Sequence, residues 1–231
     1  DFDGVVSTKR EKPKFTMDLN LKEINITDSF SRLEMLKAIA PIAKAIDGKI
    51  NATIKVSGDL EEDMTPNLNS ISGDLLGQLL NTKLKPSNSR ALSLLGSSVD
   101  FLELSKLSLN EASALFSFNN GQVSVKPFTI NYKDIGIKIG GTHGFDTSMN
   151  YDITFDVPVK YLGNTVTTAL ARLTPKDAAT VKSIPINATL TGSFSIPIFS
   201  SDIKNATTGL MKNILEKQKQ SLLNKGKDEL K

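Results

Sequence analysis

His143 is the only histidine in the chain, and the chain contains no cysteine. Catalysis of the Ser-His-Asp or Cys-His type therefore depends on this one residue, and metal sites built from several histidines or from thiolates are excluded. His143 lies in "GGTHG" at residues 140–144, a glycine-rich run predicted to form a turn between two strands. We therefore expect a solvated side chain at this position and no catalytic role.

Neighbouring carboxylates are the other common source of acid-base chemistry, and they occur at residues 61–63 and 228–229. Each group lies in a predicted turn or at a charged helix end. A general acid needs a raised pKa, usually from an apolar pocket, and nothing around these residues predicts one. "GGTHG" also lacks the spacing of a dinucleotide-binding fingerprint, and no calcium-binding loop motif occurs. The sequence therefore predicts a protein that is not an enzyme, with no cofactor, no metal and no small-molecule substrate.

The charge composition argues against a nucleic-acid partner. The formal net charge is +3, and 24 of the 28 basic residues are lysine. Base readout and two-pronged phosphate contacts favour arginine, so no nucleic-acid partner is predicted. Apolar residues make up 39% of the 231 residues, which is enough for a packed core. No apolar run approaches the roughly 18 residues of a membrane span.

Apolar and polar residues alternate along residues 118–145, "FNNGQVSVKPFTINYKDIGIKIGGTHGF", and the phase of the alternation slips twice. A period of two predicts strands that are apolar on one face. The slips, at Lys126-Pro127 and at Lys133-Asp134, predict bends or bulges that let successive pieces curve. "NNG" at residues 119–121 predicts a turn.

The same alternation predicts strands at residues 50–60, 151–157 and 186–198, and at 15–26 either one bulged strand or two strands. Two segments stay ambiguous. Residues 71–84 begin like a strand, but "DLLGQLLNTKL" fits a helix equally well. Residues 104–116 combine a capping-box pattern with a strand-like alternation.

Helices are predicted between these strands. Ser31 and Glu34 have capping-box spacing ahead of apolar residues at helical intervals, which predicts a helix over 31–47. Pro41 is expected to kink this helix or to start a second short one, and Gly48 to end it. Other helices are predicted at residues 87–95, at 162–173, from Thr174-Pro175 onward, and over the lysine-rich amphipathic segment 201–231.

These elements predict an α+β fold: a curved, mostly antiparallel β-sheet that forms an open groove, with packed helices and a long C-terminal amphipathic helix. Residues 1–200 would form the β-groove domain and residues 201–231 the terminal helix. An apolar sheet face must be covered by helices, by a second sheet or by a ligand, so it is either ordinary core or a groove for acyl chains. The residues predicted to line such a groove are Val123, Val125, Phe128, Ile130, Ile135, Ile137, Ile139, Tyr151, Ile153 and Phe155.

Three segments in combination resemble the C-terminal region of AsmA-like proteins of Gram-negative bacteria, notably the Bacteroidetes-type members. They are residues 36–77, residues 116–163 and "PINATLTGSFSIPI" at residues 185–198. The order of the motifs carries the resemblance: an apolar helix ending in A-P, a strand with G-x-L, D-M-x-P, a phenylalanine-bearing strand, N-G, V-x-V-x-P-F, I-x-G, a turn and a tyrosine-bearing strand. The match spans most of residues 15–200.

The resemblance implies a periplasmic protein of outer-membrane biogenesis, anchored to the inner membrane through an N-terminal segment absent from this chain. It implies a curved β-groove along which phospholipid passes, and no catalytic motif. The rival hypothesis is a protein-interaction or assembly module of the cell envelope with a filled core and no lipid groove. Residues 201–231 match no family motif, and they are expected to dock on a membrane surface or an envelope protein, or to cap the sheet.

Overall fold

The computed structural model describes residues 1–8, 12–32 and 39–228, with side chains described up to residue 223 apart from residues 31 and 32. Ten strands form one open sheet in which each strand pairs with its neighbour in sequence. Every one of these pairs is antiparallel. The strands are β1 (Phe2–Ser7), β2 (Lys14–Asn25), β3 (Ile46–Asp59), β4 (Ser72–Leu84), β5 (Ser113–Asn119), β6 (Gln122–Tyr132), β7 (Ile135–Gly144), β8 (Ser148–Pro158), β9 (Ser183–Ser193) and β10 (Pro197–Ser201).

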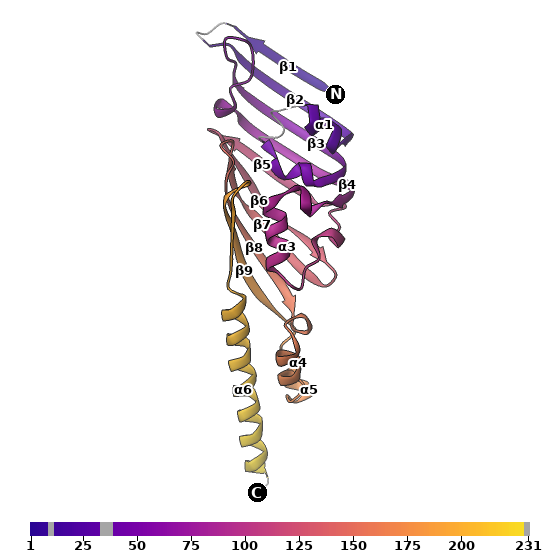
Figure 1. Cartoon of the computed structure of the whole chain (residues 1–231), viewed down its shortest axis with the longest axis vertical. Helices are drawn as coiled ribbons and strands as arrows, with labels where there is room; N and C mark the ends of the chain where they lie inside the picture. The colour runs from indigo at the N-terminus through magenta and orange to yellow at the C-terminus, as the bar shows by residue number, and fades with distance from the viewer. Residues whose placement is uncertain (9–11, 33–38, 229–231) are drawn as a thin grey trace.

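The helices near the middle of the molecule lie on one side of the sheet, and the longest helix extends beyond it at the end opposite β1 (Figure 1). The α-helices are α1 (Ile26–Arg32), α3 (Arg90–Ser98), α4 (Asn164–Leu170), α5 (Pro175–Ala178) and α6 (Ile203–Asp228). The 3-10 helices are η1 (Pro41–Ala45), η2 (Leu68–Ser70), η3 (Pro86–Asn88), η4 (Leu104–Lys106) and η5 (Val159–Tyr161). The predicted α+β fold, with an open antiparallel sheet, packed helices and a long C-terminal helix, is confirmed.

The phase slips of the sequence have two different structural causes. The register between β6 and β7 shifts between Val125 and Phe128, so the slip at Lys126-Pro127 is a bulge. The slip at Lys133-Asp134 is the turn of the β6–β7 hairpin, where Lys133 has a positive φ of 53°. A third slip, in β2 between Leu21 and Ile24, is also a bulge, so residues 15–25 form one bulged strand.

Two local predictions were wrong and one was undecided, and in each case the conformation of the segment depends on its pairing within the sheet. The glycine-rich run at residues 140–144 is part of β7 and does not form a turn. Gly48 ends no helix but lies in β3, where the register with β4 shifts between Asp47 and Lys49. The ambiguous segment at residues 72–84 is strand, because its backbone pairs with β3 along nearly its whole length and with β5 over residues 73–78.

The helix predictions succeed where a capping residue is present. Thr174 Oγ1 accepts a hydrogen bond from the backbone N–H of Asp177, with Pro175 following it, and Ser89 caps α3 in the same way through the N–H of Leu92. The helix predicted over 31–47 is wrong in its bounds: α1 begins at Ile26, Pro41 starts η1 as predicted, and β3 begins at Ile46. Glu34 of the predicted capping box lies outside the described residues.

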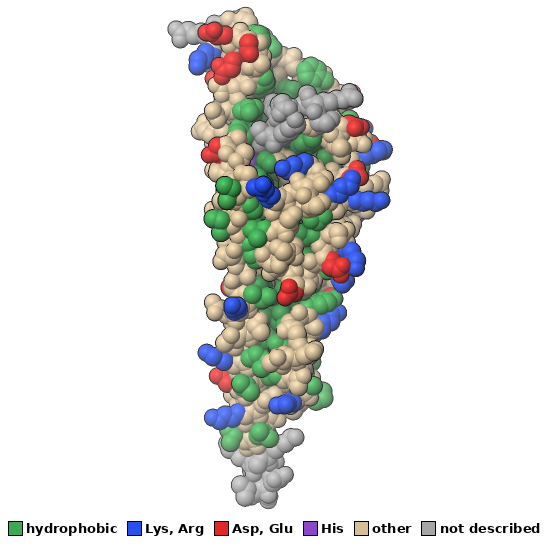
Figure 2. Space-filling model, viewed as in Figure 1, with side chains coloured by type: hydrophobic (Ala, Val, Ile, Leu, Met, Phe, Trp, Pro, Cys, Tyr) green, Lys and Arg blue, Asp and Glu red, His purple; other side chains and the backbone are tan. Residues whose placement is uncertain are grey.

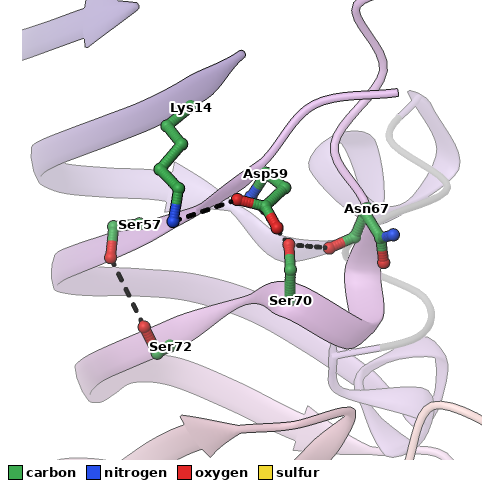
Figure 3. A network of polar contacts seen from close by, with 6 residues as sticks. All are labelled: Lys14, Ser57, Asp59, Asn67, Ser70 and Ser72. Atoms are coloured by element: carbon green, nitrogen blue, oxygen red, sulfur yellow. Dashed lines mark hydrogen bonds and ion pairs between the residues drawn. The ribbon is translucent and has the colours of Figure 1, made fainter. Parts of the chain in front are cut away.

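The β3–β4 connection is closed by a network of polar side chains (Figure 3). Ser70 Oγ accepts from the backbone N–H of Asp59 at 2.7 Å and donates to the carbonyl of Asn67 at 2.8 Å. Lys14 Nζ lies 3.3 Å from the Asp59 carboxylate and ties β2 to the same corner. These contacts join the ends of β2 and β3 to the β3–β4 connection, and we assign them a structural role.

Three apolar clusters stabilise the part of the chain that the structure describes. The largest lies between the sheet from β6 to β9 and the connection 84–112, which carries α3. A second lies on the same side of β2 to β6 and includes Ile39 and Ile71. The third joins α4 to the first half of α6 through residues such as Val166, Leu210 and Ile214.

Candidate apolar binding face

One line of side chains crosses all ten strands on the side of the sheet that carries the helices. The strand registers place these residues opposite one another from β1 to β10, and nine of the ten are apolar or aromatic, the tenth being glycine. The line is Phe2, Leu19, Ile54, Leu75, Phe116, Val125, Gly141, Tyr151, Leu190 and Phe199. We call the side of the sheet that bears this line the apolar face.

The neighbouring line of residues, which points to the other side of the sheet, is polar on nine of its ten strands. It consists of Asp3, Asp18, Lys55, Asp74, Ser117, Ser124, Thr142, Asn150, Thr191 and Ile198. Lys55 Nζ lies 3.1 Å from the Asp18 carboxylate, and Ser117 Oγ donates to Asp74 at 2.6 Å. Two adjacent lines of opposite character show that the sheet separates an apolar face from a solvated one over its whole width.

All ten predicted groove residues lie on strands β6 to β8, and most of them are covered by the chain itself. Seven are buried: Val123, Val125, Ile130, Ile135, Ile137, Ile153 and Phe155. The other three, Phe128, Ile139 and Tyr151, are partly buried against the largest cluster. The sequence pattern therefore identified residues of one face, and in this structure the chain covers most of them.

The cover over β6 to β9 is fixed at several points. α3 buries Ala91, Leu92 and Leu95 in the largest cluster. Arg90 donates a hydrogen bond at 2.9 Å to the carbonyl of Ser195 in the β9–β10 turn, so one end of α3 is held to the far hairpin. Phe101 packs edge-on against Phe155, with 5.6 Å between ring centroids. This part of the apolar face is a filled core.

The apolar face is less covered toward β1. The alternating residues of β2, which are Phe15, Met17, Leu19 and Leu21, are only partly buried, as are Leu75 and Phe116. In β1, Phe2 is 71% and Val6 54% exposed. Figure 2 shows hydrophobic side chains along the length of the helix-bearing side of the molecule. Sequence reasoning found the alternation of β2, but it did not single these residues out, because a pattern of period two carries no information about cover.

His143 lies where the two parts of the apolar face meet, and its predicted exposure was wrong. The side chain is 3% exposed. Its Nε2 lies 2.8 Å from the carbonyl oxygen of Ile39 and its Nδ1 lies 2.8 Å from the Tyr151 hydroxyl. A carbonyl only accepts, so Nε2 carries the proton and Nδ1 accepts from Tyr151. Phe194 packs edge-on against the ring at 5.5 Å.

The electrostatics of this pair follow from burial. Burial lowers the pKa of His143, against a smaller opposing effect of the hydrogen bond to Ile39. Burial raises the pKa of the Tyr151 hydroxyl. Both groups are therefore neutral at pH 7, and the network joins residue 39 to β7 and β8 without carrying charge. The described residues contain no group of three or more His, Asp or Glu side chains close enough to hold a metal ion.

α6 is packed against the rest of the molecule up to residue 218, and two leucines that follow are exposed. Gln218 Nε2 donates to the carbonyl of Ala169 at 2.9 Å and Lys217 Nζ donates to Thr180 Oγ1 at 3.1 Å, so the helix is docked on α4 and on the segment after α5 up to this point. Beyond it, Leu222 and Leu223 are exposed. Among the described residues, the structure has no helix with the length and apolar character to cross a membrane.

The chain was compared with protein-family models, with curated proteins and with solved structures, and none of them matches it.

Proposed function

We propose that this chain is a non-enzymatic segment of a periplasmic AsmA-like protein, one that holds or passes phospholipid acyl chains along its apolar face. The observation that supports this proposal most strongly is the line of apolar side chains across the ten strands, interrupted only at Gly141, next to an almost wholly polar line on the opposite face. The second cluster accounts for part of this line from β2 to β6, but the line continues to β1, where Phe2 is 71% exposed. The resemblance to AsmA-like proteins gives the envelope context and the anchoring to the inner membrane.

The acyl chains would lie against β1 and β2, where the apolar face is least covered, since Ile54 and Val56 of β3 and Phe118 of β5 are buried. Phe15, Met17 and Leu19 follow one another on alternate positions of β2, and their partners on β3 are Gly58, Val56 and Ile54. Burial is worth about 0.8 kcal/mol per CH₂ group, so contact with a few of these side chains retains a chain, while a continuous surface lets it slide. The buried residues of β6 to β8 would act as the core that keeps the sheet rigid.

A site-specific photocrosslinker tests the proposal. The crosslinker is placed at Leu19 on the apolar face, and in a matched control at Leu76, which is 52% exposed on the opposite face of β4. We expect phospholipid to be captured at residue 19 and not at residue 76 when the chain is irradiated with phospholipid vesicles. Equal capture at both positions, or none at residue 19 together with no phospholipid in lipid extracts of the purified chain, would contradict the proposal.

The second candidate is an assembly module of the envelope, and two observations favour it. Seven of the ten predicted groove residues are buried by the chain itself, and α6 presents the exposed Leu222 and Leu223. In that case Leu222→Glu would abolish capture of an envelope protein, or flotation of the chain with anionic vesicles, without changing crosslinking at Leu19. The lipid-face proposal predicts the opposite division: Leu19→Glu lowers lipid content, and Leu222→Glu does not.

A further inference from the structure

Residues 39–45 lie over the apolar face and contribute to two of its clusters, and we call them the bridging segment. Ile39, at one end, is buried in the second cluster together with Ile54 of β3 and Val123 of β6. Ala45, at the other end, is buried in the largest cluster. The bridging segment therefore helps to shield apolar side chains of both clusters from solvent.

The two ends of the bridging segment are held to the rest of the fold in different ways. At the Ala45 end, the chain continues directly into β3, and the backbone N–H of Lys85 donates to the Ala45 carbonyl at 2.7 Å. At the Ile39 end, the hydrogen bond to the sheet that the described residues make is the one that Nε2 of His143 donates to the Ile39 carbonyl, at 2.8 Å. The bridging segment is therefore held by backbone pairing at one end and by a side chain at the other.

The other groups that enclose the His143 ring belong to parts of the fold that backbone pairing holds in place. Tyr151 lies in β8, which pairs with both β7 and β9. Phe194 lies directly after β9, and the next residue, Ser195, accepts the hydrogen bond from Arg90. Displacement of the bridging segment therefore admits water to the ring without separating any pair of strands.

Among the described residues, no opposite charge faces the His143 ring. Tyr151 is the titratable group that faces it from β8. The pairing partners of His143 on β6 and on β8 are a valine and a methionine. Lys44 of the bridging segment is exposed, and residues 193–197 of the β9–β10 turn contain no titratable side chain. A proton on the ring would therefore be buried without a carboxylate to balance it.

We propose that His143 makes the attachment of the bridging segment dependent on pH, so that protonation of its ring favours release of the segment from the apolar face. In the neutral ring, Nε2 donates to Ile39 and Nδ1 accepts from Tyr151. Protonation makes both nitrogens donors, so the Tyr151 hydroxyl loses its acceptor. The hydrogen bond to Ile39 favours the charged ring, but burial opposes it more strongly, and release of the segment relieves this burial. The proposal concerns the chain's own cover and holds whether or not the apolar face binds lipid.

Amide hydrogen exchange measured by NMR on the full chain tests the proposal. The reporter is the backbone N–H of Ala43, a buried residue, which donates to the carbonyl of Ala40 at 2.9 Å. The reference is the backbone N–H of Ile153, a buried residue of β8. Between pH 7.5 and 5.5 we expect the protection factor of Ala43, which is corrected for the intrinsic effect of pH, to fall by up to about tenfold.

Low concentrations of urea separate release of the bridging segment from unfolding of the whole chain. Release exposes little surface, so exchange at Ala43 should stay nearly constant below the unfolding transition, while exchange at Ile153 accelerates. Exchange at Ala43 that follows Ile153 in urea would overturn the proposal, because the amide would then open only through global unfolding. Protection of Ala43 that does not change with pH would overturn it as well.

Two matched variants show whether His143 causes the pH dependence. His143→Gln keeps a side-chain N–H donor for the Ile39 carbonyl but has no group that titrates, so protection of Ala43 should no longer change over this pH range. Tyr151→Phe keeps the ring that titrates, so the change should remain. A change of the same size in His143→Gln, or its loss in Tyr151→Phe alone, would assign the pH dependence to another group and overturn the proposal.

Discussion

The two parts of the apolar face, β1 to β5 and β6 to β10, carry similar side chains but differ in what lies over them. Over β6 to β9, the connection 84–112 supplies α3 and a series of buried leucines, and the face is a filled core. Over β2, the corresponding row stays partly exposed. The composition of a sheet face therefore does not determine its role, because that role also depends on which parts of the chain pack over it.

Long connections join β2 to β3, over residues 26–45, and β4 to β5, over residues 85–112, and the second of these supplies the cover over β6 to β9. β6 and β7 are joined by the two residues Lys133 and Asp134, so this hairpin contributes no cover. The connection between β4 and β5 is long and contains two 3-10 helices besides α3. Ser89 caps the start of α3, and Arg90 forms a hydrogen bond with the β9–β10 turn, so this end of the helix is fixed over the sheet. α3 therefore shields from solvent the apolar side chains of the strands that follow it in sequence.

The largest expected effect contrasts one phenylalanine from each part. Phe155→Ala removes a side chain that is 1% exposed and packed against Phe101, so we expect a loss of about 3–5 kcal/mol in the free energy of unfolding. Phe15→Ala removes a partly exposed ring, for which a loss of about 1 kcal/mol is expected. Urea unfolding of both variants measures the difference. Equal losses would show that β2 is as well packed as β8, and would remove the basis for placing acyl chains there.

Substitution of two strand glycines should lower the free energy of unfolding by an amount that does not depend on what covers the apolar face. Gly73 in β4 has a φ of 136° and Gly141 in β7 has a φ of 150°. An added Cβ would overlap the carbonyl oxygen of Lys55 or of Asn150 on the adjacent strand. Each Gly→Ala substitution should therefore cost about 1–3 kcal/mol, and the two costs should be similar because backbone, not cover, causes them.

The control for these variants is Gly209→Ala in α6, where nothing lies within 4 Å of the added carbon. Alanine favours a helix over glycine, so we expect a gain of up to about 1 kcal/mol. Thermal and urea unfolding of the three variants give the comparison. If Gly141→Ala were tolerated while Gly73→Ala was not, the cost of the substitution would depend on the part of the sheet in which the glycine lies and not on its local backbone conformation.

The fold could be predicted from the sequence wherever a period of two was long or a cap was present. The alternation in 118–132 and 151–157 gave the strands, and Thr174-Pro175 gave the start of α5, because these signals act within a few residues. The strand at residues 72–84 could not be decided, since its pairing with β3 and β5 is set by residues distant in sequence.

The apolar face was predicted in part. The sequence identified the side chains of β6 to β8 that share the face, but not that α3 covers them, because cover depends on how the connection 84–112 folds over the sheet. His143 was predicted to be solvated because glycines on both sides of it indicate a turn. In the structure these glycines lie in a strand, Gly141 passes close to the backbone of β8, and the histidine points inward.

The last expected effect concerns His143, which links the two parts. Burial lowers its pKa in the folded chain below the value of about 6.5 in the unfolded chain, so the unfolded state binds more protons in this range. The contribution of neutral His143 is complete above the unfolded pKa and is lost as the pH falls below it. We expect the free energy of unfolding to fall by no more than about 1.4 kcal/mol per pH unit between pH 6.5 and the folded pKa.

His143→Gln should flatten the dependence of the unfolding free energy on pH between 8 and 5.5, a window above the titration of the carboxylates. Tyr151→Phe is the matched control, because it removes the hydrogen bond to Nδ1 but keeps the titrating ring. That variant should lose about 1 kcal/mol at pH 8 and keep the slope. A slope unchanged in His143→Gln would show that another group titrates, and that the contact with Ile39 does not join the two parts of the face in a pH-dependent way.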